Sequence, residues 1–443
     1  MGFGKIGQGI SQAAQRLAER AREQARVARE KAAAAAQAQA GATRTGPANG
    51  HTAPVSARTP SAAPSVDRLE ARARQAPVVL EAGPRNQFSP ATFKERMEGL
   101  KKEVAEQKLR GLGVDLGDLL SKLNPFDDRV VIFDNFGEGV THGDDVEAVL
   151  QDNAGVEDGE IRRIGTGATP PPPGASLEER VEHRAVSFLD STSDAMERVL
   201  GLDGGVDVIN QSQSISPVRV ADEMWRAASG DPEKKADLAE ELGLPRDAED
   251  GEILQALVDT VDRVFEESGE IAEAKERYDG LSDRLEERGI MHVVTAGNTG
   301  RFLDTLDRRG VTYDGDFTDS VLFNDNVLVV AAANGGAEDG IAGFSTPSDH
   351  VDVAIDGTDI EVEGGRDADG TSFAAPQVTA LIAELRRINP DLTNDEIREI
   401  IAEASTDTAA TDREEGAGIL DPDRALELAR ESLVEEPRRR IAG

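Results

Sequence analysis

The 443-residue chain contains no cysteine, which excludes disulfide bonds, thiolate zinc sites and cysteine nucleophiles. Its formal net charge at pH 7 is −36, yet residues 1–110 are basic, with 19 Lys and Arg against 10 Asp and Glu. The remaining residues carry 30 of the 49 basic and 75 of the 85 acidic side chains. An anionic body of this size repels nucleic acid and anionic lipid, so we expect neither nucleic acid nor membrane as a partner.

The chain has no apolar run long enough to cross a membrane, and residues 1–20 lack an apolar stretch of the signal-peptide type. We therefore expect a cytoplasmic protein, with export by an unconventional route as the alternative.

Three segments precede the main folded domain in the predicted organisation. Residues 1–40 are rich in Ala, Gln, Arg and Glu, which is typical of a solvated helical arm suited to self-association. The Pro-, Ala- and Ser-rich residues 41–65 predict a flexible, disordered linker. Short helical patterns broken by Pro and Gly predict a helical extension over 66–128. The main domain is expected over 129–434.

Continuous apolar runs alternate with helical patterns from residue 129 onward. Strands are expected in RVVIFD (129–134), IRRIG (161–165), VDVINQS (206–212), IMHVVTAGN (290–298) and NVLVVAAAN (326–334). Ser176 and Glu179 form a capping-box pattern before a helix that ends near residue 200, and a charged stretch over about 218–288 predicts a helical insertion. This alternation predicts an α/β fold, a three-layer sandwich with a mostly parallel central sheet and ligands at the carboxyl ends of its strands.

Four polar residues stand where strands meet loops or helices: Asp134, His142, Asn298 and Ser372. Acyl transfer needs a nucleophilic oxygen, an imidazole base, a carboxylate that orients the base, and donors for an oxyanion. Each residue alone also fits an ordinary role, the aspartate as a turn residue and the serine as a helix cap. Their order and shared position favour the catalytic interpretation.

The segment DGTSFAAPQVTAL (369–381) is expected to begin a buried helix. A serine at a helix N-terminus offers its own unpaired N–H, and the positive end of the helix dipole, to developing negative charge. Gly370 is expected to permit the tight approach to this helix, and Pro376 to be tolerated because the first turn needs few acceptors for N–H groups.

Several motifs resemble the subtilisin-like serine proteases. GTSFAAPQV (370–378) resembles the catalytic-serine signature of that family, TAGNTG (295–300) its oxyanion segment and VINQS (208–212) the segment beside its substrate cleft. FSTPSDHVDVAIDG (344–357) and GAGILDPDRAL (416–426) are similar to the strand before the serine and to the closing helix. The resemblance covers roughly residues 129–428.

The resemblance implies a serine endopeptidase that cleaves peptide or protein substrates through an acyl-enzyme. In it Asp134 orients His142, His142 is the base, Ser372 is the nucleophile, and Asn298 completes the oxyanion hole. Two further residues would line the substrate cleft, Ser212 and Gly297. No cofactor is assigned; many members of the family bind Ca²⁺, but no loop here has a recognisable calcium spacing, so no metal ligand is assigned.

The chain departs from the family around the first two catalytic positions. Asn135-Phe136 follows Asp134 where the family has a small residue and glycine. After His142-Gly143 the family prefers Thr and later a small residue and glycine, whereas this chain has Asp144-Asp145 and Glu147-Ala148. Asp144 or Asp145 is therefore the alternative orienting carboxylate, and a catalytically impaired binding or regulatory protein is the alternative function. The four other histidines are expected to be ordinary surface or packed residues: His51, His183, His292 and His350.

Overall fold

The computed structural model describes residues 129–442 apart from 154–155, 157, 203 and 338. The arm, the linker and the extension predicted over residues 1–128 lie outside the described residues.

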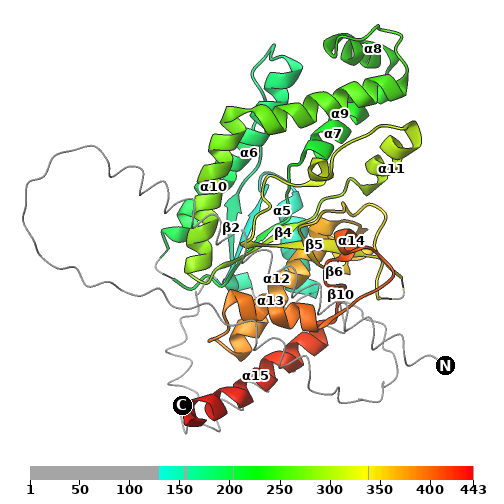
Figure 1. Ribbon diagram of the computed structural model, residues 1–443. Coiled ribbons are helices and arrows are strands. Elements are labelled where there is room, and N and C mark those ends of the chain that lie inside the picture. The colour runs from blue at the N-terminus through cyan, green and yellow to red at the C-terminus, as the bar shows by residue number, and fades with distance from the viewer. Residues whose placement is uncertain (1–128, 154–155, 157, 203, 338, 443) are drawn as a thin grey trace, which may run out of the picture. The chain divides into compact units, whose positions relative to one another are not determined.

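An eight-stranded sheet forms the centre of the described part, in the order β2-β1-β3-β4-β5-β6-β10-β9 (Figure 1). Its strands are β1 (Val130–Asp134), β2 (Ile161–Gly165), β3 (Val208–Gln211), β4 (Met291–Thr295), β5 (Val327–Ala333), β6 (Val351–Asp356), β9 (Ser405–Thr406) and β10 (Ile419–Leu420). All neighbouring strands are parallel except β9 and β10. A separate antiparallel hairpin contains β7 (Ile360–Val362) and β8 (Arg366–Ala368).

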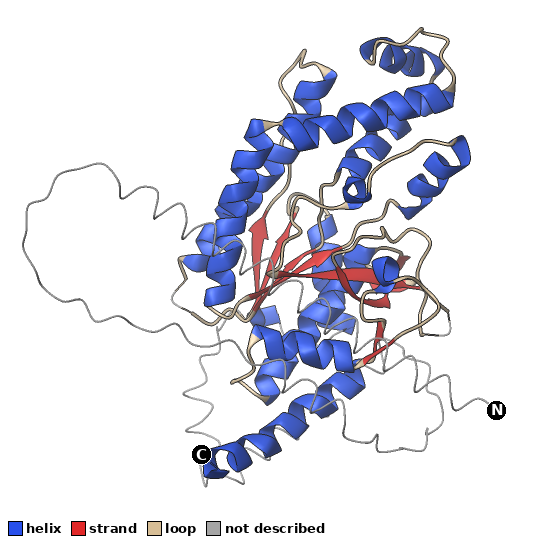
Figure 2. Cartoon of the chain, in the orientation of Figure 1, coloured by secondary structure: helices blue, strands red, loops and turns tan. Residues whose placement is uncertain are grey.

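Helices cover both faces of the sheet, which confirms the predicted three-layer α/β fold (Figures 1 and 2). On one face lie α6 (Leu177–Leu200) and α10 (Gly269–Glu287); α9 (Asp250–Glu267) packs on α6, and α7 (Pro217–Ser229) packs on α9. On the other lie α5 (His142–Ala148), α12 (Thr371–Ile388), α13 (Asn394–Glu403) and α15 (Pro422–Ala442). The remaining α-helices are α8 (Pro232–Glu241), α11 (Gly300–Arg309) and α14 (Asp412–Glu415).

The apolar run of β1 shows why the sheet is buried on both sides. Val131 and Phe133 belong to the core beneath α6 and α10, whereas Val130 and Ile132 belong to the core beneath α12. Successive side chains of a strand point to opposite faces, so the apolar run Val130–Phe133 supplies both cores that the two helix layers cover.

Helix α6 begins with the predicted capping box. The Ser176 hydroxyl accepts a hydrogen bond from Glu179 N (3.2 Å), and the Glu179 carboxylate accepts one from Ser176 N (2.7 Å). Farther along, Arg277 of α10 forms ion pairs with Asp194 and Glu197 of α6. These pairs are exposed and add little stability, so the apolar faces hold the two helices together.

Residues 217–287 contain the four helices α7 to α10. Ile253 and Leu254 of α9 and Tyr278 of α10 are fully buried in the same core as Val131 of β1. The Tyr278 hydroxyl donates to the carbonyl oxygen of Leu322 (2.9 Å). Helix α10 therefore packs on α6 and against β4, whereas α9 packs on α6 and α7. That the range 218–288 is an insertion remains a prediction.

Asp262 of α9 provides a pH-dependent test of this packing. Burial first, and then the carboxylates of Glu266 and Asp314, raise the pKa of Asp262 to about 6. Its neutral form thus stabilises the fold below the unfolded-state pKa near 3.8, and this stabilisation is lost as the pH rises through 6. We expect Asp262→Asn to raise the melting temperature at pH 7.5 and to change it little at pH 4.

The matched control is Glu273→Gln, which removes one negative charge from an exposed position on α10. Thermal unfolding followed by circular dichroism at pH 4, 6 and 7.5 would measure both variants. A shift for Asp262→Asn that does not vary with pH, or that equals the shift of the control, would contradict the assignment.

Candidate active site

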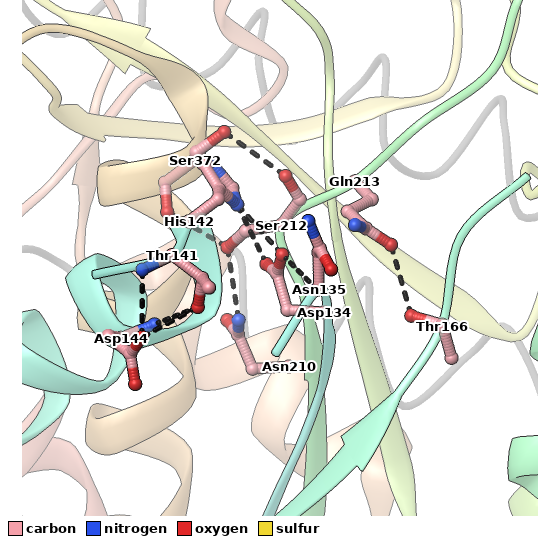
Figure 3. A network of polar contacts seen from close by, with 10 residues as sticks. All are labelled: Asp134, Asn135, Thr141, His142, Asp144, Thr166, Asn210, Ser212, Gln213 and Ser372. Atoms are coloured by element: carbon pink, nitrogen blue, oxygen red, sulfur yellow. Dashed lines mark hydrogen bonds and ion pairs between the residues drawn. The ribbon is translucent and has the colours of Figure 1, made fainter. Parts of the chain in front are cut away.

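The carboxyl ends of β1, β3 and β4 bring the residues of the predicted site to one edge of the sheet. Asp134 is the last residue of β1, and Asn298 follows β4. His142 is the first residue of α5, and Ser372 is the second residue of α12. Figure 3 shows Asp134, His142 and Ser372 close together although distant stretches of the sequence supply them.

The contact between Asp134 and His142 determines which nitrogen of the imidazole carries the hydrogen. Asp134 is fully buried, and its carboxylate oxygens lie 2.8 and 2.9 Å from His142 Nδ1 (Figure 3). The backbone N–H of Asn135 donates to the same carboxylate (2.7 Å). A carboxylate can only accept here, so Nδ1 carries the hydrogen and Nε2 is left as the acceptor. A base for a hydroxyl proton needs this tautomer.

Asp144 has a structural role at the start of α5. Its carboxylate accepts hydrogen bonds from Thr141 N (2.8 Å) and Thr141 Oγ1 (2.7 Å), and Thr141 caps the helix in return. These hydrogen bonds, ahead of the ion pair with Arg163, hold the pKa of Asp144 below its ordinary value. The carboxylate is thus committed to fixing the turn that positions His142.

Asp145 likewise has its own partner. It forms an ion pair with Arg366 of β8 (2.7 Å). Within the described part of the chain, the carboxylate that contacts His142 is that of Asp134. The geometry therefore favours Asp134 over both alternatives as the orienting carboxylate.

Phe136 departs from the family pattern, and the structure accommodates it through Gly143. A Cβ atom on Gly143 would lie 2.5 Å from the Phe136 ring, and Gly143 N donates to the carbonyl oxygen of Asn135 (3.2 Å). The Arg163 guanidinium covers the same ring, 5.2 Å from its centroid. The bulky side chain thus packs beside His142 without displacing it.

Ser372 is 7% exposed, and its hydroxyl donates to the carbonyl oxygen of Ser212 (3.1 Å; Figure 3). Among the described residues it forms no hydrogen bond with His142. The His142 ring lies against Phe373, with 6.1 Å between the ring centroids. To donate its proton to the imidazole, the hydroxyl must first leave the Ser212 carbonyl.

Pro376 lies in the second turn of α12, so the expectation that it falls in the first turn is wrong. It has no N–H, which leaves the carbonyl oxygen of Ser372 without its helical donor. The Ser212 hydroxyl donates to this oxygen instead (2.8 Å). The end of β3 and the start of α12 are therefore joined by two reciprocal hydrogen bonds.

Asn298 is held with its amide nitrogen free to donate. Its Oδ1 atom accepts hydrogen bonds from Thr371 N and Thr371 Oγ1, both 3.0 Å long. The Ser372 N–H lies in the first turn of α12, where no intrahelical acceptor exists. The Asn298 amide and the Ser372 N–H are thus two donors that could serve the predicted oxyanion hole.

Gly370 was expected to permit a tight approach to α12, but its backbone conformation does not require glycine. Its φ of 162° is extended backbone that any residue adopts. A Cβ atom there would lie 3.5 Å from Asn298 Nδ2. Glycine at this position therefore leaves open the space in front of the Asn298 amide.

Gly297 lies beside the cleft segment that contains Ser212. It has a φ of +105°, and a Cβ atom on it would lie 3.0 Å from Thr346 Oγ1 and 3.5 Å from Ser214 Oγ. The carbonyl oxygen of Gly297 accepts from Thr346 N (3.0 Å). The structure thus brings the two predicted cleft segments next to each other.

The remaining described histidines lie outside this assembly. His292 is buried in β4, its Nε2 lies 3.0 Å from Gln211 Oε1, and burial lowers its pKa to about 3. His183 contacts Thr169, and His350 lies near Asp319. His51 lies outside the described residues.

Neither a metal centre nor a membrane span is found where the structure can be described. No group of three or more His, Asp or Glu side chains is placed to hold a metal ion among residues 129–442 with their gaps. No helix in the same residues is both long and apolar enough to cross a membrane.

Sequence reasoning missed three polar residues that support the site, namely Asn210, Thr371 and Thr379. Asparagine is uncommon in a buried strand, so Asn210 within the run VDVINQS was a usable signal. Thr371 lies inside the signature motif and orients Asn298. Thr379 gave no local signal, because its partner belongs to a strand 169 residues away.

Known proteins resemble this chain over part of its length. The family model described as the subtilase family, Peptidase_S8, matches residues 185–418. Among solved structures, the prenylagaramide maturation protease PagA is 14% identical with a TM-score of 0.40, and covers 70% of this chain and 98% of its own. The serine protease MycP1 of the type VII (ESX-1) secretion system is 17% identical with a TM-score of 0.39, covering 73% and 88%. No curated protein matches the chain.

Proposed function

This chain belongs to the subtilase family and is a serine-type peptidase, and we propose that it is an endopeptidase whose triad is Asp134, His142 and Ser372. The observation that carries the proposal is the placement of His142 Nδ1 against both oxygens of the buried Asp134 carboxylate, beside a serine at a helix N-terminus. Peptides or proteins are its substrates.

The first half of the reaction forms an acyl-enzyme. His142 Nε2 takes the proton of Ser372 Oγ while this oxygen attacks the scissile carbonyl carbon. Negative charge then develops on the carbonyl oxygen, where Asn298 Nδ2 and the Ser372 N–H donate to it. The imidazolium is stabilised by Asp134 and returns the proton to the leaving amine as the peptide C–N bond breaks.

The second half of the reaction releases the acyl group. A water molecule gives a proton to His142 Nε2 and attacks the ester carbon, and the same two donors stabilise the second oxyanion. Collapse of this intermediate breaks the ester bond, and His142 returns the proton to Ser372 Oγ. Substrate would lie along the segments of Ser212 and Gly297, which the fold brings together.

Three finer statements remain predictions, namely calcium binding, self-association through residues 1–40, and a cytoplasmic location. None of them is needed for the proposed chemistry.

The proposal is tested by incubating the full chain with a peptide library and a fluorophosphonate probe, with mass spectrometry as the readout. We expect internal peptide bonds to be cleaved and the probe to attach to Ser372, because a base-activated serine reacts quickly with it. Binding of peptides without labelling or cleavage would favour the impaired binding protein instead.

Asn298→Ala tests the oxyanion hole separately from the triad. We expect kcat to fall by roughly 10²–10³ with KM nearly unchanged, which is the loss seen when subtilisin loses one oxyanion donor. The matched control is Asn326→Ala. Asn326 lies just before β5, at the amino ends of the strands and away from the site, so this variant should keep full activity. A rise in KM with unchanged kcat would mean that Asn298 only binds substrate.

A further inference from the structure

A buried chain of hydrogen bonds runs from the interior of α12 to the backbone of the proposed nucleophile. Thr379 Oγ1 donates to Asn210 Oδ1 (2.9 Å), and Asn210 Nδ2 donates to Ser212 Oγ (3.0 Å). Ser212 Oγ donates in turn to the carbonyl oxygen of Ser372 (2.8 Å). Thr379 and Asn210 are fully buried, and Ser212 is 3% exposed.

The direction of every bond in this chain is fixed by its last member. A carbonyl oxygen can only accept, so the Ser212 hydroxyl must donate its single hydrogen to Ser372. The Ser212 oxygen then accepts from the amide nitrogen of Asn210, whose amide oxygen is left to accept from Thr379. These hydrogen bonds have only one possible set of directions. Removing the Thr379 hydroxyl therefore leaves the Asn210 amide oxygen without its donor and the amide without one of the two bonds that orient it.

The chain also fixes a helix against a strand. Ser372 and Thr379 are seven residues apart, two turns of α12, and so share one face of that helix. Asn210 and Ser212 are two residues apart, and alternate positions of an extended chain face the same side. Two points on the helix are thus tied to two neighbouring points on and just after β3.

The start of α12 needs this tie because Pro376 leaves the Ser372 carbonyl without a helical donor. A buried carbonyl that loses its donor is destabilised, so the Ser372 peptide would shift to find another donor. The Cα atom of Ser372 carries the proposed nucleophile and joins this peptide group to the one that contains the Ser372 N–H. A shift of the carbonyl would therefore move both the side chain and that N–H.

We propose that Thr379 and Asn210 are positioning residues that act through Ser212 to set the position of Ser372 for attack. This inference rests on the proposed function. Neither side chain reaches the reacting atoms; each orients the next donor in the chain. Their loss therefore slows acylation without weakening substrate binding.

The test compares Thr379→Val with Thr379→Ser in the full chain. Valine keeps the shape but removes the hydroxyl, and we expect kcat and the fluorophosphonate labelling rate to fall by about 10- to 100-fold, as small misplacements of catalytic groups do. KM is expected to stay within about twofold. Serine keeps the donor and should restore the rates of the unmodified chain.

The matched control is Thr192→Val. Thr192 is also fully buried, and it accepts a hydrogen bond from Gln211, the neighbour of Ser212 that faces the other layer of helices. The control is expected to lower the melting temperature while leaving kcat unchanged. Should Thr379→Val not fold, Thr379→Ala removes the hydroxyl without placing a methyl group against Asn210, and the same loss of kcat is expected.

Three outcomes overturn the proposal. Unchanged kcat in a folded Thr379 variant, or a loss of kcat that serine does not restore, overturns the positioning role alone. An unmodified chain that neither labels nor cleaves overturns the proposed function, and the positioning role with it.

Discussion

Replacing Ser372 with alanine is expected to abolish fluorophosphonate labelling and to lower kcat by about 10⁶-fold, the size of the loss when subtilisin loses its nucleophile. His142→Ala should cause a similar loss, because the imidazole is the acceptor for the Ser372 proton. The double variant should be no worse than either single variant, since members of one catalytic unit do not add.

Peptidase assays of the three variants, with labelling as a second readout, would measure this non-additivity. His183→Ala is the matched control, because His183 contacts Thr169 at the surface and should be dispensable. Full activity of His142→Ala would disprove the mechanism and support the binding-protein alternative.

Asp134→Asn is expected to lower kcat by about 10⁴-fold, the loss that the corresponding change causes in a related triad. The new amide can present a hydrogen to His142 Nδ1, which then favours the tautomer whose Nε2 already carries a hydrogen. That tautomer cannot accept the Ser372 proton. Substrate KM should change little, because the carboxylate is fully buried.

Asp145→Asn is the control for this change. Asp145 loses only its ion pair with the exposed Arg366 side chain, so its activity should stay within a few-fold of the unmodified chain. If Asp134→Asn were fully active and Asp145→Asn or Asp144→Asn inactive, one of the latter carboxylates would orient the imidazole instead.

The sequence was sufficient for those parts of the fold that depend on local patterns. The apolar runs of β1, β4 and β5 predicted buried parallel strands, and the capping box predicted the start of α6. The same reasoning located Ser372 at a helix N-terminus. Each of these signals lies within a few neighbouring residues.

Features that depend on distant partners were not predictable. The reason that Pro376 is tolerated is a hydroxyl on Ser212, which is supplied from 160 residues before Ser372. The sequence suggested Asp144 only as an alternative orienting carboxylate, and neither its hydrogen bonds with Thr141 nor its ion pair with Arg163 was predicted. Similarly, helical patterns over 218–288 did not reveal that Tyr278 lies in the central core.

The order of the proposed catalytic groups along the chain also bears on how the enzyme is made. The orienting carboxylate is on β1, whereas the nucleophile is on α12, 238 residues later. At about 5–20 residues per second, a ribosome needs roughly 10–50 s to cover that distance. During this interval the nascent protein has the proposed base but no nucleophile, so it cannot hydrolyse a peptide bond by the proposed mechanism until Ser372 has been made.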